Sequence, residues 1–237
     1  MTSSNSEKSQ IRYAGLAGFM FLFVIVADLS GMFITSRFDV PGNFVETAHR
    51  IMGAELLYRI GLSSGLIGSL CTLFLAIGLY VVLKPIDNNL ALLALLFRSI
   101  EAALGGVQNI FSFVVLKLYL GADYINAFNP KQLSVLVDAH SLASSATNVS
   151  AIFFGVGSIL FFYLFLNSAY IPKALSALGL LASLLVPIIC FASLISPQHA
   201  RIGQFGWLPI AVAEISVGFW LLFKGVSVQP RETEMWM

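Results

Sequence analysis

The chain has 237 residues, of which 58% are hydrophobic and 11% charged, with a net charge of +1 and a mean hydropathy of +0.87. Soluble domains are near a quarter charged, so this composition excludes a globular water-soluble enzyme and predicts an all-α integral membrane protein with the lipid bilayer as its partner. The small net charge predicts no nucleic-acid partner, and two cysteines exclude a disulfide framework.

A membrane-spanning helix needs about 20 mostly apolar residues, and six stretches meet that requirement. The predicted spans are residues 13–35, 60–83, 90–116, 143–166, 174–195 and 205–223. They form a single transmembrane domain over residues 13–224, a bundle of about six helices. Polar tails over residues 1–12 and 225–237 flank it. The first span is too long for a signal peptide and contains Asp28, so we expect it to remain uncleaved.

The connections between the spans carry their own signals. An amphipathic helix is predicted from Phe44 to Tyr58, before the second span. The short link Lys84 to Asn89 makes the second and third spans an antiparallel hairpin. The fourth helix is predicted to begin near Gln132, ahead of its membrane part, and the fifth to bend at Pro187.

Orientation depends on the distribution of Lys and Arg. An even number of spans places both tails on one side, and the basic residues divide equally between the two sides. Short loops and tails count more than long connections in the positive-inside rule, which favours cytoplasmic termini.

Ionisable residues at membrane depth are the most informative ones, since each costs several kcal/mol unless it faces the protein interior. Asp28, Arg98, Glu101 and Glu214 are in this position. On the third span one face carries a polar stripe, formed by Arg98, Glu101, Gly105, Gln108, Asn109 and Ser112. The fourth helix carries a second predicted stripe, formed by Asp138, Ser141, Ser145, Asn148 and Gly155. Lipid cannot hydrogen-bond such groups, so both stripes are predicted to line one interior space.

Two ion pairs at i, i+4 spacing precede the second span. Glu46 and Arg50 lie on the polar side of the amphipathic helix, where we expect a solvated pair. Glu55 and Arg59 project from its apolar side and are predicted to extend the polar interior to one membrane surface.

The deep charges allow a structural and a functional interpretation. An Arg and a Glu one turn apart can neutralise each other and hold helices together. However, three acids and one Arg at depth leave a formal charge of −2, which a low dielectric does not tolerate. At least one acid is therefore expected to be protonated or to meet a bound cation, which favours a functional site.

Several weaker signals complete the prediction. His140 lies beside Asp138 and is a proton-relay candidate, whereas the histidine spacing predicts no metal site. Gly61 and Gly65 form a GxxxG pattern typical of close helix packing. No cofactor motif is present. The candidate ligand-binding residues are Asp28, Glu55, Arg59, Arg98, Glu101, Gln108, Asn109, Asp138, His140, Asn148 and Glu214.

Four stretches carry a resemblance to a known family: AELLYRIG at 54–61, LYVVLKP at 79–85, LALLFRSIEA at 93–102 and NSAYIPKALSALG at 167–179. Together they resemble the bacterial multi-pass membrane proteins of domain of unknown function 4386. The resemblance implies an integral protein of a bacterial plasma membrane and lends no catalytic residue. Lys173 stands where the family pattern would have Arg, and Ala169 where it would have Gly.

Three functions remain open. The first is an uncharacterised membrane protein that binds or moves a small anionic or lipid-like ligand with proton linkage, held by Arg98 and Arg59. The second is an intramembrane lipid-modifying enzyme, with Glu101 or Asp138 as general base and His140 as partner. The third is a non-catalytic structural or regulatory subunit whose polar cluster fixes helix register.

Overall fold

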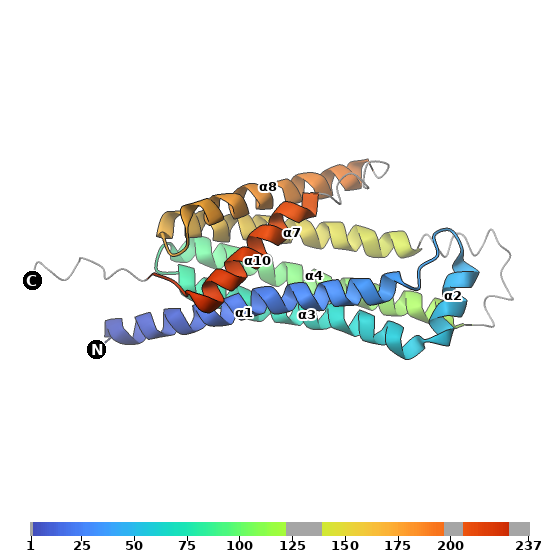
Figure 1. The fold of residues 1–237 in the computed structure, drawn as a ribbon. Helices are drawn as coiled ribbons and strands as arrows, with labels where there is room; N and C mark the ends of the chain where they lie inside the picture. Colours follow the sequence, from blue (N-terminus) through green and yellow to red (C-terminus); the bar gives the residue numbers. More distant parts are fainter. Residues whose placement is uncertain (1, 122–138, 197–205, 228–237) are drawn as a thin grey trace, which may run out of the picture.

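The computed structural model describes residues 2–121, 139–196 and 206–227, with side chains described for 7–121, 146–196 and 206–227. Over these residues the chain forms α-helices joined by turns (Figure 1). The helices are α1 (Thr2–Ser36), α2 (Phe44–Gly53), α3 (Glu55–Leu83), α4 (Asn88–Leu120), α7 (Ala139–Ser168), α8 (Lys173–Ile195) and α10 (Trp207–Phe223).

Among the described residues, five helices are long and apolar enough to cross a membrane: α1, α3, α4, α7 and α8. The sixth predicted span corresponds to α10, which is apolar but has 17 residues, the shortest length that spans a hydrocarbon core. The chain is therefore an all-α integral membrane protein, as the composition predicted.

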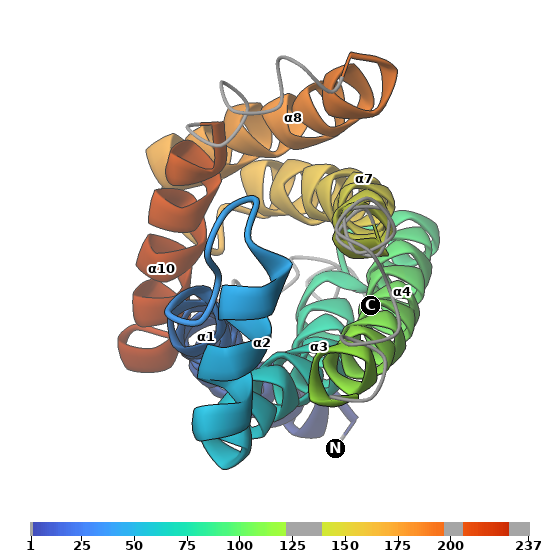
Figure 2. The ribbon, with the colours of Figure 1, turned by 90° about the vertical axis from the view of Figure 1, so that its right-hand side faces the viewer.

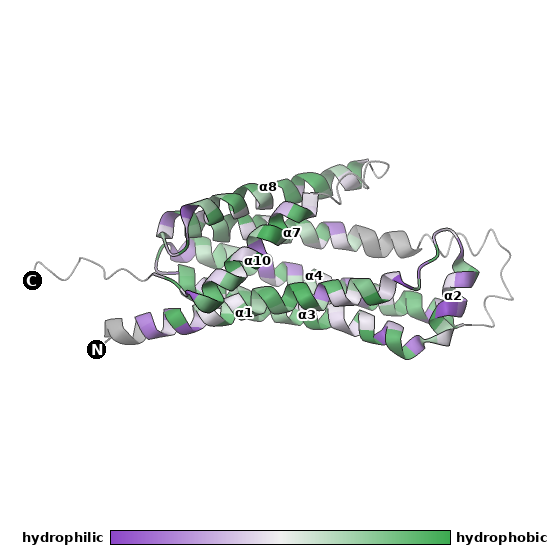
Figure 3. Ribbon diagram, viewed as in Figure 1, coloured by the Kyte–Doolittle hydropathy of each residue, from purple (hydrophilic) through white to green (hydrophobic). Residues whose placement is uncertain are grey.

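The helices form a ring around the bundle axis (Figure 2). Going round the ring, α1 packs on α3, α3 on α4, α4 on α7, α7 on α8, α8 on α10, and α10 returns to α1. Helix α1 begins and α10 ends at the same end of the bundle, which we call the terminal end (Figure 1). Helix α2 lies across the opposite end, which we call the α2 end. Hydrophilic residues gather on α2 and near the helix ends, whereas α8 and the middle of α1 are hydrophobic (Figure 3).

The polar amino-terminal tail is helical. Residues 1–12 were predicted to lie outside the first span, and α1 begins at Thr2 and runs through them into that span without a break. No Gly or Pro interrupts residues 2–14, and Glu7, Lys8 and Gln10 are good helix formers, so the helix extends beyond the apolar stretch.

The amphipathic helix is shorter than predicted. The expected helix from Phe44 to Tyr58 is broken at Ala54, whose φ of −148° and ψ of 47° are not helical. Gly53, the weakest helix former in the segment, precedes the break. Glu55 and Tyr58 therefore belong to α3, and the Asn43 side chain caps α2 by accepting from the Glu46 N–H at 3.1 Å.

Two short turns close the terminal end. The hairpin predicted between the second and third spans is present, and Asp87 caps α4 by accepting from the N–H groups of Asn89 and Leu90. After α7, Ala169 has a φ of +56°, a left-handed conformation that favours glycine. This explains why Gly is the residue expected there from the family pattern.

The buried apolar residues that the structure describes form two cores. The larger, here the main core, includes Phe21, Leu79 and Phe165 near the terminal end and continues along α8 to Cys190. The smaller, here the α2 core, packs Phe44 of α2 against the end of α4. The rings of Phe44 and Tyr119 stack there with centroids 4.8 Å apart.

Glycines allow close helix contacts, as the GxxxG pattern predicted. A Cβ added at Gly31 of α1 would lie 2.8 Å from the carbonyl oxygen of Gly61. One added at Gly18 would lie 2.5 Å from the backbone nitrogen of Leu222 in α10. In lipid no hydrophobic driving force holds helices together. Small residues allow close van der Waals packing, which stabilises the contact instead.

Candidate functional site

The polar face of α4 has Arg98 at its centre. This side chain is 3% exposed. Arg98 lies about 15 Å along α4 from Asn88, a distance that corresponds to the middle of a bilayer core. Its Nε lies 3.1 Å from Oε2 of Glu101, one turn further on. Neither atom has a hydrogen-bond partner in acceptable geometry, although both are buried. The two side chains are thus close in space but do not form a hydrogen bond with each other.

Helix α7 holds the other side of Arg98. Nη1 donates to Oγ of Ser158 at 3.3 Å, and the guanidinium carbon lies 4.7 Å from the centroid of the Phe154 ring. Gly157 leaves room for the Arg98 stem, since a Cβ there would come within 2.9 Å of Arg98 Cγ. These contacts fix the guanidinium between two helices.

The polar stripe predicted on the fourth helix is only partly the face that meets α4. Gly155 of that stripe contacts Pro187 of α8 instead. The small and polar residues of α7 that contact α4 include Ser158, Gly157 and Ser150, and Oγ of Ser150 donates to the carbonyl oxygen of Glu101 at 3.1 Å. These three residues were missed, although their spacing of seven to eight is that of one helix face and could have identified them.

Two further acids come from other helices. Glu214 of α10 is 9% exposed, and Asp28 lies on α1. Both interact electrostatically with Arg98, and with Glu101 as well. The fold therefore brings together all four ionisable groups predicted at membrane depth. We call Asp28, Arg98, Glu101 and Glu214 the charge cluster.

Asp28 differs from the other three members of the cluster because it is exposed. Its carboxylate lies against Gly68 of α3, where an added Cβ would clash with Oδ1. The absent side chain at Gly68 therefore leaves the space that Asp28 occupies.

The remaining α4 candidates lie further along the same helix. Asn109 is half-buried, donates from Nδ2 to the carbonyl oxygen of Gly105 at 2.9 Å, and faces Gly65 of α3. Gln108 and Asn148 are also half-buried. Whether these three contact a ligand stays a prediction.

Glu55 and Arg59 do not join the charge cluster. They form an ion pair of 2.6 Å at the start of α3, with side chains 41% and 44% exposed. The Glu46 and Arg50 pair on α2 has the same spacing, a distance of 2.9 Å and similar exposure. The two pairs were predicted to differ, and the structure gives them the same environment.

Asp138 lies outside the described residues, and so does the side chain of His140, whose backbone belongs to α7. The proton relay predicted between Asp138 and His140 therefore stays a prediction. Among the described residues no group of three or more His, Cys, Asp and Glu side chains is arranged to hold a metal ion.

Comparison with known proteins gives two matches. The family model described as Domain of unknown function (DUF4386) matches residues 16–225. An uncharacterised protein of Archaeoglobus fulgidus is 29% identical over 154 residues, which cover 63% of this chain and 74% of that protein. No solved structure matches the chain.

Proposed function

The chain belongs to the DUF4386 family, and we propose that it binds, and moves across the membrane, a small anionic or lipid-like ligand in a proton-linked manner. The charge cluster is the proposed site, with Arg98 as the group that holds the anion. Arg59 is not part of this site, because its guanidinium pairs with Glu55 at the exposed start of α3.

The supporting observation is the buried, unsatisfied pair of Arg98 Nε and Glu101 Oε2. A buried polar atom without a partner costs about 1–3 kcal/mol, and more when the group is charged. A guanidinium presents several donors that suit the two oxygens of a carboxylate or phosphate. A bound anion that accepts a hydrogen bond from Nε would remove this cost. In an ion pair with a purely structural role, we would expect Arg98 and Glu101 to satisfy each other by a hydrogen bond.

Proton linkage follows from the charges around Arg98. Three carboxylates interact with one guanidinium, so the site repels an anion while all three are ionised. Protonation of the acids removes this repulsion. We therefore expect anion binding to be accompanied by proton uptake.

The structural role is the second candidate, because Arg98 and Glu101 also join α4 to α7 through Ser158 and Ser150. A helix cross-link predicts loss of assembly when Arg98 is replaced, whereas a ligand site predicts loss of ligand movement in a folded protein. The lipid-modifying enzyme has no comparable support from the described residues.

The test uses the purified full chain in phosphatidylcholine liposomes loaded with a pH-sensitive dye. Addition of succinate or inorganic phosphate under an imposed proton gradient should acidify the lumen, and Arg98→Met should abolish this. Arg59→Met is the matched control, since it removes an exposed, paired Arg and should leave the signal intact. Absence of dye response in the wild type, or equal loss in both variants, would refute the anion site.

A lipid-like ligand is tested in the same preparation. Native mass spectrometry of the protein in mixed phosphatidylcholine and phosphatidylglycerol should show a retained anionic lipid that Arg98→Met loses. Retention by the variant would exclude a lipid held by Arg98.

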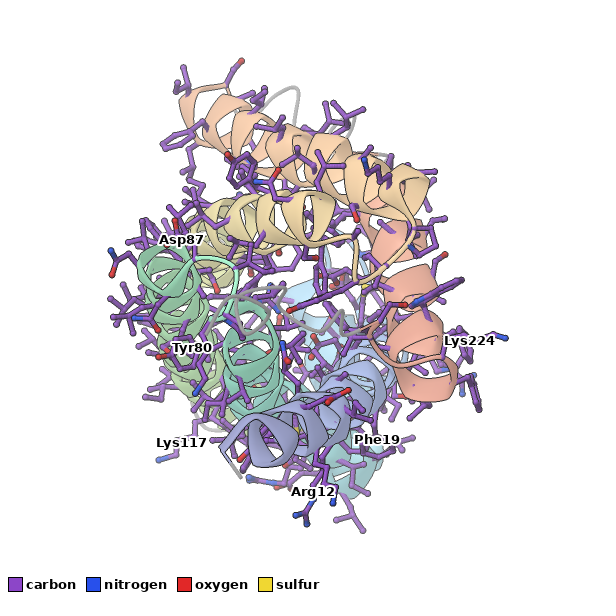
Figure 4. All side chains as sticks on the ribbon, turned by 90° about the vertical axis from the view of Figure 1, so that its left-hand side faces the viewer. Arg12, Phe19, Tyr80, Asp87, Lys117 and Lys224 are labelled. Carbon is purple, nitrogen blue, oxygen red and sulfur yellow. The ribbon has the colours of Figure 1, made fainter. Side chains whose placement is uncertain are left out.

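We also propose that the protein lies in the plasma membrane with cytoplasmic termini. At the terminal end Lys8, Arg12, Lys84, Lys173 and Lys224 are exposed. In Figure 4 Arg12 and Lys224 point away from the bundle. A fluorescent-protein fusion at the carboxyl terminus should be bright and an alkaline phosphatase fusion inactive. A dark fluorescent-protein fusion together with an active phosphatase fusion would place the termini on the opposite side of the membrane.

A further inference from the structure

The outer face of α1 near the terminal end combines positive charge with apolar surface. Lys8, Arg12, Gly15, Phe19 and Phe23 lie within a sector of about 80° around this helix. Gly15 is half-buried and the other four are exposed, and in Figure 4 Arg12 and Phe19 lie along the outer side of α1. We call these five residues the outer α1 face. It looks toward lipid and is opposite to the face that carries Asp28.

The two cations of this face repel each other. Lys8 and Arg12 are four residues apart, so their side chains are neighbours on the helix surface. Among the described residues neither forms an ion pair with a carboxylate, whereas the i, i+4 pairs on α2 and α3 each join an Arg to a Glu. Like charges at this spacing destabilise a helix, and an anion placed between them would remove the repulsion.

The apolar part of the face suits an acyl chain. A Cβ added at Gly15 would meet nothing within 4 Å, so the surface beside Arg12 is open. Further along, the exposed rings of Phe19 and Phe23 stack with centroids 5.8 Å apart. Phe23 lies about 16 Å along the helix from Arg12, which corresponds to half of a hydrocarbon core about 30 Å thick. A head group at Arg12 would therefore place its acyl chain along these rings.

Helix α10 adds a second apolar wall. The rings of Phe219 and Phe223 stack with centroids 6.1 Å apart and are 50% and 74% exposed. Helices α1 and α10 are antiparallel and meet at Gly18 and Gly218, where a Cβ on Gly18 would lie 2.7 Å from the carbonyl oxygen of Gly218. Phe19 and Phe219 each follow the contact glycine by one residue. In an antiparallel pair this equal rotation puts both rings on the same side of the contact.

We propose that the outer α1 face binds one anionic phospholipid. Its phosphate lies between Lys8 and Arg12, and its acyl chains pack against Gly15 and the phenylalanine pairs of α1 and α10. A zwitterionic head group brings an ammonium of its own to the two cations, so a lipid with net negative charge is preferred. The site is separate from the charge cluster, and the proposal does not rest on the proposed function.

The test counts the phosphatidylglycerol and phosphatidylcholine molecules that the purified full chain retains in native mass spectrometry. Lys8→Gln with Arg12→Gln removes the two cations of the site. Lys84→Gln with Lys173→Gln is the matched control, because it removes the same charge from exposed residues at the same end of the bundle. All four positions lie on the surface, so both double variants should fold.

We expect retention of one phosphatidylglycerol to fall about tenfold in the first double variant and to stay near the wild-type level in the control, with phosphatidylcholine unchanged in both. Equal losses in the two double variants would overturn the site, because they would show a general attraction to the basic end of the bundle. The charge cluster is intact in both, so failure here is distinct from failure of the tests on Arg98.

The acyl-chain contact is tested without a change of charge. Gly15→Leu fills the open surface beside Arg12 and should also lower phosphatidylglycerol retention. Gly106→Leu in α4 is the control, since Gly106 is half-buried as well and a Cβ there meets nothing within 4 Å. Retention that is unchanged by Gly15→Leu, or lowered equally by both variants, would show that the lipid does not lie on the outer α1 face.

Discussion

The terminal end of the bundle and the region of the charge cluster solve the same packing problem in different ways. At the terminal end, Gly18 and Gly78 bring helix backbones together and apolar side chains fill the interior. Around the charge cluster, the interior faces of α1, α4 and α10 carry four ionisable side chains instead. Lipid removes the hydrophobic difference between inside and outside, so close contact stabilises the terminal end, whereas polar groups kept at a cost mark the charge cluster as the functional region.

The largest expected effect separates the two roles of the charge cluster. Arg98→Met alone leaves three acids without their buried cation and should cost about 3 kcal/mol of stability. The double variant Arg98→Met, Glu101→Leu should have an unfolding temperature in detergent near or above that of the wild type. Buried charges that are kept for function lower stability, so their joint removal restores it. If the double variant is as unstable as the single one, the pair is a helix cross-link and the comparison fails.

The terminal end should respond to side-chain size rather than to charge. Gly18→Val would place a side chain against the α10 backbone and should lower stability by about 2 kcal/mol, or roughly 4–8 °C in unfolding temperature. Gly15→Val, three residues earlier on the same helix, is the matched control, because a Cβ at Gly15 meets nothing within 4 Å. Similar losses at both positions would show that helix propensity, and not contact with α10, limits stability.

A smaller gain is expected at the turn after α7. Ala169 is strained at φ +56°, so Ala169→Gly should raise stability by up to about 1 kcal/mol. The same exchange within a regular helix, Ala177→Gly in α8, should lower it by about as much. Thermal unfolding of both variants gives the comparison, and a loss at position 169 would show that the turn relaxes without glycine.

The sequence predicts the membrane class and the depth of the charges because bilayer thickness and the cost of buried charge act on each helix separately. Arg98, Glu101, Asp28 and Glu214 could thus be selected before any packing was known. The contacts across helices could not be predicted, since the rotation of α7 requires Gly157 to fit against Arg98 of α4 while Gly155 fits against Pro187 of α8. The break at Ala54 was missed for a related reason, because the apolar periodicity continues through it while the backbone does not.

The smallest expected effect decides how far the functional region extends. Arg59 was predicted to belong to the interior, yet its side chain is as exposed as that of Arg50. Arg59→Gln and Arg50→Gln should each cost only about 0.3–0.5 kcal/mol, and that cost should diminish with added salt, because exposed i, i+4 pairs are weak and screened. Thermal unfolding in low and high salt measures both. A loss at Arg59 several times larger than at Arg50, and insensitive to salt, would extend the functional region to the start of α3. Equal losses would confine it to the charge cluster.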